Sequence, residues 1–232
     1  MCGQCGCEVP TAVAPSGPRQ RLELHQDLLS RNDQQAARNR AHFQRHGLRS
    51  LNLLSAPGSG KTALLEKLAR RWPRPPIGVI VGDLATDNDA QRLRAAGARA
   101  VQIRTGDLCH LDAALVDQAF AQLDCSGMDL LVIENVGNLV CPAAFDLGEQ
   151  RRVAVLSVTE GEDKPLKYPA LFSSADAVVI NKSDLAEATG FDRRSAIANL
   201  QATAPQAELF ELSARTGEGI EALIRWLDAQ PA

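Results

Sequence analysis

From Leu48 onward, short runs of apolar residues alternate with longer segments in which apolar residues recur every three or four positions. Short apolar runs are typical of buried strands, and the wider spacing is typical of amphipathic helices. The pattern predicts strands at residues 51–54, 77–81, 100–103, 130–134, 153–158, 177–180 and 208–212. It predicts helices at residues 62–71, 88–96, 111–123, 193–202 and 220–229.

This alternation predicts an α/β fold. Strands joined through helices pair in parallel, and strands that are apolar on both faces need helices on both sides of the sheet. We expect about seven mainly parallel strands with helices on both faces. The sequence divides into a flexible Cys-rich tip and tether at residues 1–18, a helical segment of one or two amphipathic helices at 19–47, and an α/β domain at 48–232.

Composition excludes several classes of protein. The 232 residues are 45% hydrophobic and 23% charged, which suffices for a sizeable core. A net charge of -3 gives no field that would hold nucleic acid or an anionic membrane surface. No apolar run approaches the roughly 20 residues that span a bilayer. We expect a cytoplasmic protein that binds neither nucleic acid nor membrane, with its six cysteines reduced.

A phosphate-binding loop is predicted between the first strand and the first of these helices, where the sequence from Ser55 to Thr62 reads SAPGSGKT. Glycines let backbone N–H groups surround phosphate oxygens, the lysine reaches the β and γ phosphates, and the threonine hydroxyl reaches Mg²⁺. Ser55 stands where a glycine is usual. The expected phosphate contacts are Gly58, Ser59, Gly60, Lys61, Thr62 and Ala63.

The tetrad Asn181-Lys182-Ser183-Asp184 follows the sixth predicted strand and resembles the guanine-binding motif of GTPases. The aspartate there accepts hydrogen bonds from guanine N1 and N2, which adenine cannot donate, and an unpaired buried acceptor discriminates strongly. Residues 213–215 resemble the second base-contact loop. GTP is therefore the expected nucleotide. Its expected base contacts are Asn181, Lys182, Asp184, Ser213, Ala214 and Arg215.

Acidic residues and a glycine follow two other predicted strands. We expect Asp83 and Glu134 to hold Mg²⁺ together with Thr62, and the Gly137 N–H to meet the γ phosphate. The alternative is that Asp83 and Asp89 merely cap the following helix. The expected catalytic residues are Lys61, Asp83 and Glu134. No glutamine or arginine of these motifs is assigned to the attacking water, so we expect slow hydrolysis.

Taken in chain order, these motifs resemble the HypB family, the nickel-incorporation GTPases of [NiFe]-hydrogenase maturation. The matching segments are residues 2–7, 55–62, 82–83, 105–112, 134–142 and 181–184. The resemblance implies a P-loop GTPase of the SIMIBI class that forms a homodimer with GTP bound. It also implies delivery of Ni²⁺, with a partner metallochaperone of the HypA type, to the hydrogenase large-subunit precursor. Some members carry a His-rich storage stretch, but this chain has four histidines.

Two clusters are candidate metal sites. Cys2, Cys5 and Cys7, with the terminal amine, offer four donors suited to square-planar Ni²⁺. The alternative is a surface cluster, or half of a zinc site completed by another chain. Cys109 and His110 are expected to open a helix, and Cys141 follows the γ-phosphate loop.

Three ligands in this second cluster leave a position for water or for a second copy at a dimer interface, and they accept Ni²⁺ or Zn²⁺. Because Cys141 lies four residues beyond Gly137, we expect nucleotide to change the metal affinity. The alternative is that both cysteines fill the core and His110 caps the helix.

Other functions remain open. A small-molecule kinase would share the phosphate loop but would not need the guanine tetrad. A urease-type nickel GTPase is expected to carry Cys-Pro-His where this chain has Cys141-Pro142-Ala143. A passive metal-binding module would leave the nucleotide loops without a role.

Overall fold

The structure, a computed structural model, describes residues 18–74, 76–83, 87–106 and 108–230, with side chains from residue 26 onward. The predicted cysteine tip therefore lies outside the described residues. The central element is a parallel sheet of seven strands in the order β3-β2-β4-β1-β5-β6-β7. The strands are β1 (Arg49–Ser55), β2 (Gly78–Asp83), β3 (Arg99–Arg104), β4 (Leu130–Glu134), β5 (Arg151–Ser157), β6 (Ala177–Asn181) and β7 (Glu208–Glu211). The predicted α/β fold is thus confirmed.

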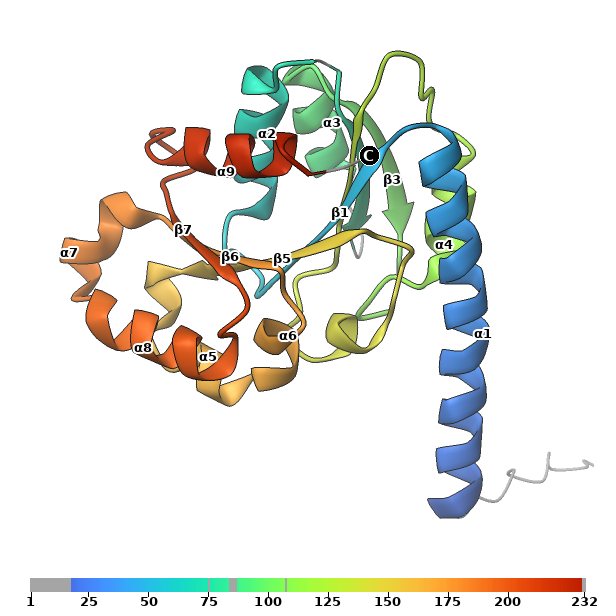
Figure 1. Cartoon of the computed structure of the whole chain (residues 1–232), viewed down its shortest axis with the longest axis horizontal. Coiled ribbons are helices and arrows are strands. Elements are labelled where there is room, and N and C mark those ends of the chain that lie inside the picture. The colour runs from blue at the N-terminus through green and yellow to red at the C-terminus, as the bar shows by residue number, and fades with distance from the viewer. Residues whose placement is uncertain (1–17, 75, 84–86, 107, 231–232) are drawn as a thin grey trace, which may run out of the picture.

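One face of the sheet is covered by α2 (Lys61–Arg71), α3 (Asn88–Ala95) and α9 (Ile220–Asp228), which lie together in Figure 1. Each of these helices turns buried aliphatic residues toward the strands, so that alternate residues of β1, β2 and β4 enter one apolar core. Burial on both faces explains why these strands read as continuous apolar runs in the sequence.

Two further cores lie on the opposite face. One joins β2, β3 and β4 to α4 (Ala113–Phe120) and to Phe43 of α1 (Pro18–Arg45). The other joins β5 and β6 to α6 (Pro169–Ser173) and α8 (Arg193–Thr203). The described part of α1 is a single helix that packs along α4 (Figure 1), where the sequence left one or two open.

Several short elements were not predicted. They are η1 (Cys141–Ala144), η2 (Val158–Glu160), α5 (Lys164–Lys167), α6, η3 (Ser183–Leu185) and α7 (Ala186–Thr189). Elements of this length show no helical repeat in a sequence. In the described residues, no helix is both long and apolar enough to cross a membrane.

The parallel arrangement brings the carboxyl ends of β1, β2, β4 and β6 to one edge of the sheet. Glu134, the last residue of β4, is in register with Leu53 on β1 and with Val81 on β2. Ligands of open α/β sheets bind at this edge, outside the carboxyl ends of the strands. The loops that follow these strands therefore form the candidate site.

Candidate functional site

The predicted phosphate loop connects β1 to α2. Gly58 and Gly60 have φ values of +73° and +99°, in the left-handed region that only glycine adopts without strain. These two turns wrap the backbone ahead of the first turn of α2, where N–H groups and the positive end of the helix dipole favour phosphate. Local geometry thus supports the sequence interpretation.

Ser55 takes the place of the first glycine and contacts the loop lysine directly. The Lys61 ammonium donates a 2.8 Å hydrogen bond to the Ser55 hydroxyl, which also accepts from the Ser59 hydroxyl. Burial lowers the pKa of Lys61, while the nearby carboxylate of Glu134 opposes that shift. The serine therefore gives a buried ammonium a polar partner at the base of the loop.

The expected magnesium ligands border one cavity of about 410 Å³, which also contacts Lys61. Thr62 Oγ1 donates to Glu134 Oε1 at 2.8 Å, and Asp83 lies at the end of the neighbouring strand. Glu134 Oε2 is buried and has no hydrogen-bond partner among the described residues. Burial raises the pKa of Glu134 to about 7, although Lys61 acts in the opposite direction.

A buried carboxylate oxygen without a partner fits a divalent cation, because Mg²⁺ takes oxygen ligands and offsets the cost of the charge. Thr62, Asp83 and Glu134 supply such oxygens at one place. Asp89 borders the same cavity and pairs with Arg92 at 3.2 Å. It lies in the first turn of α3, where Asp87 occupies the cap position.

The predicted γ-phosphate loop packs closely against the phosphate loop. A Cβ atom added to Gly137 would lie 2.8 Å from the Pro57 Cα atom, closer than real side-chain carbons come to backbone. Only a glycine therefore allows this approach. The Gly137 backbone lies at the rim of the phosphate cavity, as expected for a group that senses the terminal phosphate.

The base loop is tied to the phosphate loop by side chains of the predicted tetrad. Asn181 Nδ2 donates to the Ser59 carbonyl at 2.8 Å, and Asn181 Oδ1 accepts from the Ala214 N–H at 3.0 Å. Lys182 Nζ donates to the Gly58 carbonyl at 2.8 Å. One asparagine thus fixes the two base-contact segments to each other and to the phosphate loop.

The predicted guanine reader, Asp184, accepts hydrogen bonds from the Ser213 hydroxyl and from Arg215 Nε, the latter at 2.9 Å. The bond from Ser213 is the main reason that the pKa of Asp184 is lowered, and Arg215 adds to the effect. The carboxylate is therefore ionised and acts only as an acceptor. All six predicted base-contact residues lie within this set of loops, and their roles remain predictions.

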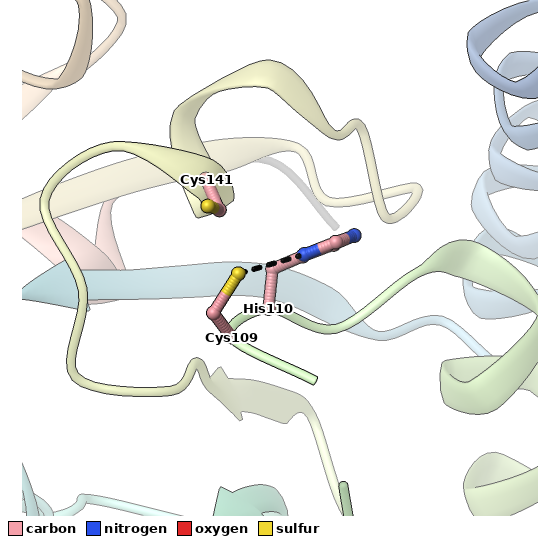
Figure 2. A group of neighbouring side chains, drawn as sticks. All are labelled: Cys109, His110 and Cys141. Atoms are coloured by element: carbon pink, nitrogen blue, oxygen red, sulfur yellow. Dashed lines mark hydrogen bonds between the residues drawn. The ribbon is translucent and has the colours of Figure 1, made fainter. Parts of the chain in front are cut away.

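The second predicted metal cluster is brought together from two segments (Figure 2). One ligand atom each from Cys109, His110 and Cys141 lies within 4.8 Å of the others. The Cys109 sulfur is 3.7 Å from His110 Nδ1. Cys141 begins η1 and comes from the loop that follows Gly137.

Burial and neighbouring side chains shift the pKa values of two of these ligands. The His110 ring stacks on Phe145 with centroids 4.0 Å apart, and burial lowers its pKa, which favours the neutral imidazole that binds metals. A hydrogen bond with the neighbouring Cys109 is the main cause of a raised pKa at Cys141, which favours the thiol. A bound cation would instead favour the thiolate that ligates metals.

One local prediction is wrong. Cys109 and His110 do not open α4, because that helix begins at Ala113 and the Asp112 carboxylate caps it by accepting from the Leu115 N–H at 2.8 Å. The two ligands lie in the preceding loop. The predicted helix over 111–123 started early because Leu111 is a buried core residue with helical spacing.

Sequence reasoning also missed functional neighbours. Phe145 carries no motif signal, and Asn135 reads only as the second residue of the γ-phosphate loop. Asn135 is fully buried and bonds across three segments. A fully buried polar residue beside two sites is visible only once the chain is folded.

Comparisons with known proteins agree with this geometry. The model of the CobW/HypB/UreG nucleotide-binding domain matches residues 50–211. Hydrogenase maturation factor HypB of Azotobacter vinelandii is 53% identical over 224 residues, which span 94% of this chain and 73% of the relative. Hydrogenase/urease maturation factor HypB of Helicobacter pylori is 41% identical, covering 89% of this chain and 87% of the relative.

A solved structure is also similar. The crystal structure of Helicobacter pylori HypB in complex with nickel has a TM-score of 0.82 and 42% identity, covering 85% of this chain and 93% of the other. The likeness extends well beyond the phosphate loop, because the matched domain model includes the loop that carries Cys141.

Proposed function

The chain belongs to the HypB hydrogenase-maturation branch of the CobW/HypB/UreG nucleotide-binding family, and from this premise we propose that it hydrolyses GTP to control nickel delivery. The observation that carries the proposal is the continuity of one segment. The magnesium-side residue Glu134, the γ-phosphate residue Gly137 and the metal ligand Cys141 follow each other within eight residues of sequence. The segment therefore touches both candidate sites.

The nucleotide half of the proposal assigns roles to the loops described above. Asp184 accepts from the guanine edge, and Lys61 neutralises the β and γ phosphates. Thr62, Asp83 and Glu134 would hold Mg²⁺, which would offset the negative charge of the phosphates. Gly137 donates its N–H to the γ phosphate. No described side chain is assigned to orient the attacking water, so turnover is slow.

The metal half treats Ni²⁺ as cargo. Cys109, His110 and Cys141 supply three ligands, and a second copy of the chain or water supplies the fourth. GTP favours the homodimer that brings two such sets together. Zn²⁺ competes for the same thiolate and imidazole ligands. Cys2, Cys5 and Cys7 form a separate nickel site at the N-terminus.

Delivery requires partners. Together with a metallochaperone of the HypA type, the chain delivers the nickel to the hydrogenase large-subunit precursor in the cytoplasm. The proposal is supported by the names of the relatives, which are hydrogenase maturation factors, and by the nickel in the similar solved structure. The similar Helicobacter pylori protein is also named for urease, so both precursors belong in a delivery assay.

The decisive experiment measures metal affinity in two nucleotide states. The full chain with Cys2, Cys5 and Cys7 replaced by alanine is titrated with Ni²⁺ in the presence of GDP or a non-hydrolysable GTP analogue. We expect the affinity to differ by at least about 5-fold, the lower end of usual allosteric coupling. Equal affinities would show that the nucleotide does not control this site.

A pair of cysteine variants tests the ligand set. Cys141→Ala is expected to remove metal binding at this site. Cys125→Ala is the matched control, because Cys125 is a half-buried thiol that packs against the core of α4, away from the cluster. GTP turnover measured with and without Ni²⁺ completes the experiment. Loss of metal binding in both variants would contradict the assignment.

A further inference from the structure

Asn135 is a fully buried side chain that touches three segments of the chain. Its Oδ1 atom accepts from the Val136 N–H at 2.9 Å and from the Leu111 N–H at 3.3 Å. Its Nδ2 atom donates to Asn52 Oδ1 at 3.3 Å. Each polar atom of the amide therefore has at least one hydrogen-bond partner within the protein.

The two N–H groups that share Oδ1 belong to different candidate sites. Val136 lies between Asn135 and Gly137, on the loop assigned to the γ phosphate. Leu111 directly follows the metal ligand His110. A single oxygen atom thus bonds the backbone of the nucleotide loop and the backbone of the metal-ligand loop. Figure 2 shows that His110 and Cys109 come from one segment and Cys141 from another.

We propose that Asn135 is the positioning residue that transmits the nucleotide state to His110 and Cys109. This inference rests on the proposed function and identifies the residue that couples the nucleotide loop to the metal ligands. When the γ phosphate draws the Gly137 loop, the side chain of Asn135 moves with that loop. Its hydrogen bond then pulls the Leu111 N–H, and the two preceding residues change their distance to Cys141.

The far end of the metal-ligand loop is held in place by α1. The Ala113 N–H donates to Asn32 Oδ1 at 2.9 Å, and the Ala113 carbonyl accepts from Asn39 Nδ2 at 2.8 Å. Asn39 Nδ2 also donates to the Leu147 carbonyl at 3.0 Å, on the segment that follows Cys141. The metal-ligand loop is therefore held by α1 at Ala113 and by Asn135 at Leu111.

The side chain of Leu111 is packed against the strand that leads to the magnesium-side residues. Its side chain is fully buried and fills the space above Gly82, where an added Cβ would lie 2.9 Å from the Leu111 side chain. Gly82 precedes the magnesium-side residue Asp83. Tightly packed residues of this kind shift as a unit between discrete arrangements. The strand end before Asp83 and the loop that carries Gly137 are thus both in contact with Leu111.

The test compares two buried asparagines. In the full chain with Cys2, Cys5 and Cys7 replaced by alanine, Ni²⁺ affinity is measured with GDP and with a non-hydrolysable GTP analogue. Asn135→Ala is expected to bring the ratio of the two dissociation constants to within about two-fold of one, against at least about 5-fold in the parent. Asn39→Ala is the matched control, because it loosens the other end of the same loop. It should change both affinities together and keep the ratio.

The two ratios distinguish failure of the proposed function from failure of the Asn135 link alone. A parent ratio of one would overturn the proposed coupling and this inference together. A parent ratio above five that survives in Asn135→Ala would overturn this inference alone.

Hydrogen exchange in the wild-type chain gives a second readout that needs no substitution. We expect the exchange rate of the Leu111 amide to differ between the two nucleotide states, because its acceptor moves. An unchanged rate would also refute the link.

Discussion

Replacing Glu134 with glutamine should stabilise the protein without nucleotide and abolish the proposed GTP hydrolysis. Burial raises the pKa of this carboxyl from 4.5 to about 7, so above neutral pH the fold contains a charge that it disfavours. The folded state holds the proton more tightly, so stability is highest below the unfolded pKa and falls as pH rises through the folded pKa. A shift of this size corresponds to about 3 kcal/mol, at about 1.4 kcal/mol for each pKa unit.

Glutamine keeps the oxygen that accepts from Thr62 and carries no charge, so it resembles the protonated glutamate. The assay is thermal unfolding of both proteins without nucleotide at pH 4 and pH 8, which lie below the unfolded pKa and above the folded pKa. We expect nearly equal Tm values at pH 4 and a variant that melts roughly 6–12 °C higher at pH 8, the shift that about 3 kcal/mol produces in a chain of this size. Added Mg²⁺ and GTP should raise the Tm of wild type more than that of Glu134→Gln. A variant gain that is the same at both pH values would refute the reasoning.

Three other predictions follow from the site. Asp184→Asn should weaken GTP binding and improve binding of xanthosine triphosphate, whose carbonyl accepts from an amide, and unchanged selectivity would exclude the guanine assignment. Gly137→Ala should lower GTP affinity more than GDP affinity, because its Cβ would meet the Pro57 backbone at 2.8 Å, and competition binding measures both. Deletion of residues 1–7 should remove one tight Ni²⁺ site and leave GTP hydrolysis intact, and an unchanged stoichiometry by metal titration would contradict a site there.

The motifs that follow the strands could be located from the sequence. A motif such as residues 55–62 signals its place because glycine, lysine and threonine are each required by local geometry and charge. The parallel sheet followed from the alternation of apolar runs with helical segments, and its seven strands are confirmed. In both cases the information lies within a few consecutive residues.

Relations between distant segments could not be predicted in this way. The hydrogen bond from the Leu111 N–H to Asn135 joins two loops 24 residues apart, and neither residue type predicts it. The start of α4 was predicted too early because Leu111 is buried and fits the apolar repeat of the helix, although it lies in the preceding loop. Ser55 read only as a departure from a glycine, although its hydroxyl is a partner for the buried Lys61.

The contacts of α1 bear on where the cooperative unit of this protein begins. Asn32 and Asn39 satisfy both backbone groups of Ala113, and Phe43 fills part of the core beneath α4. A fragment starting at residue 48 would leave those backbone groups without their partners and open a space the size of an aromatic ring. We therefore expect the part of α1 from Asn32 onward to melt together with the nucleotide-binding body, so that the folding unit extends back into α1.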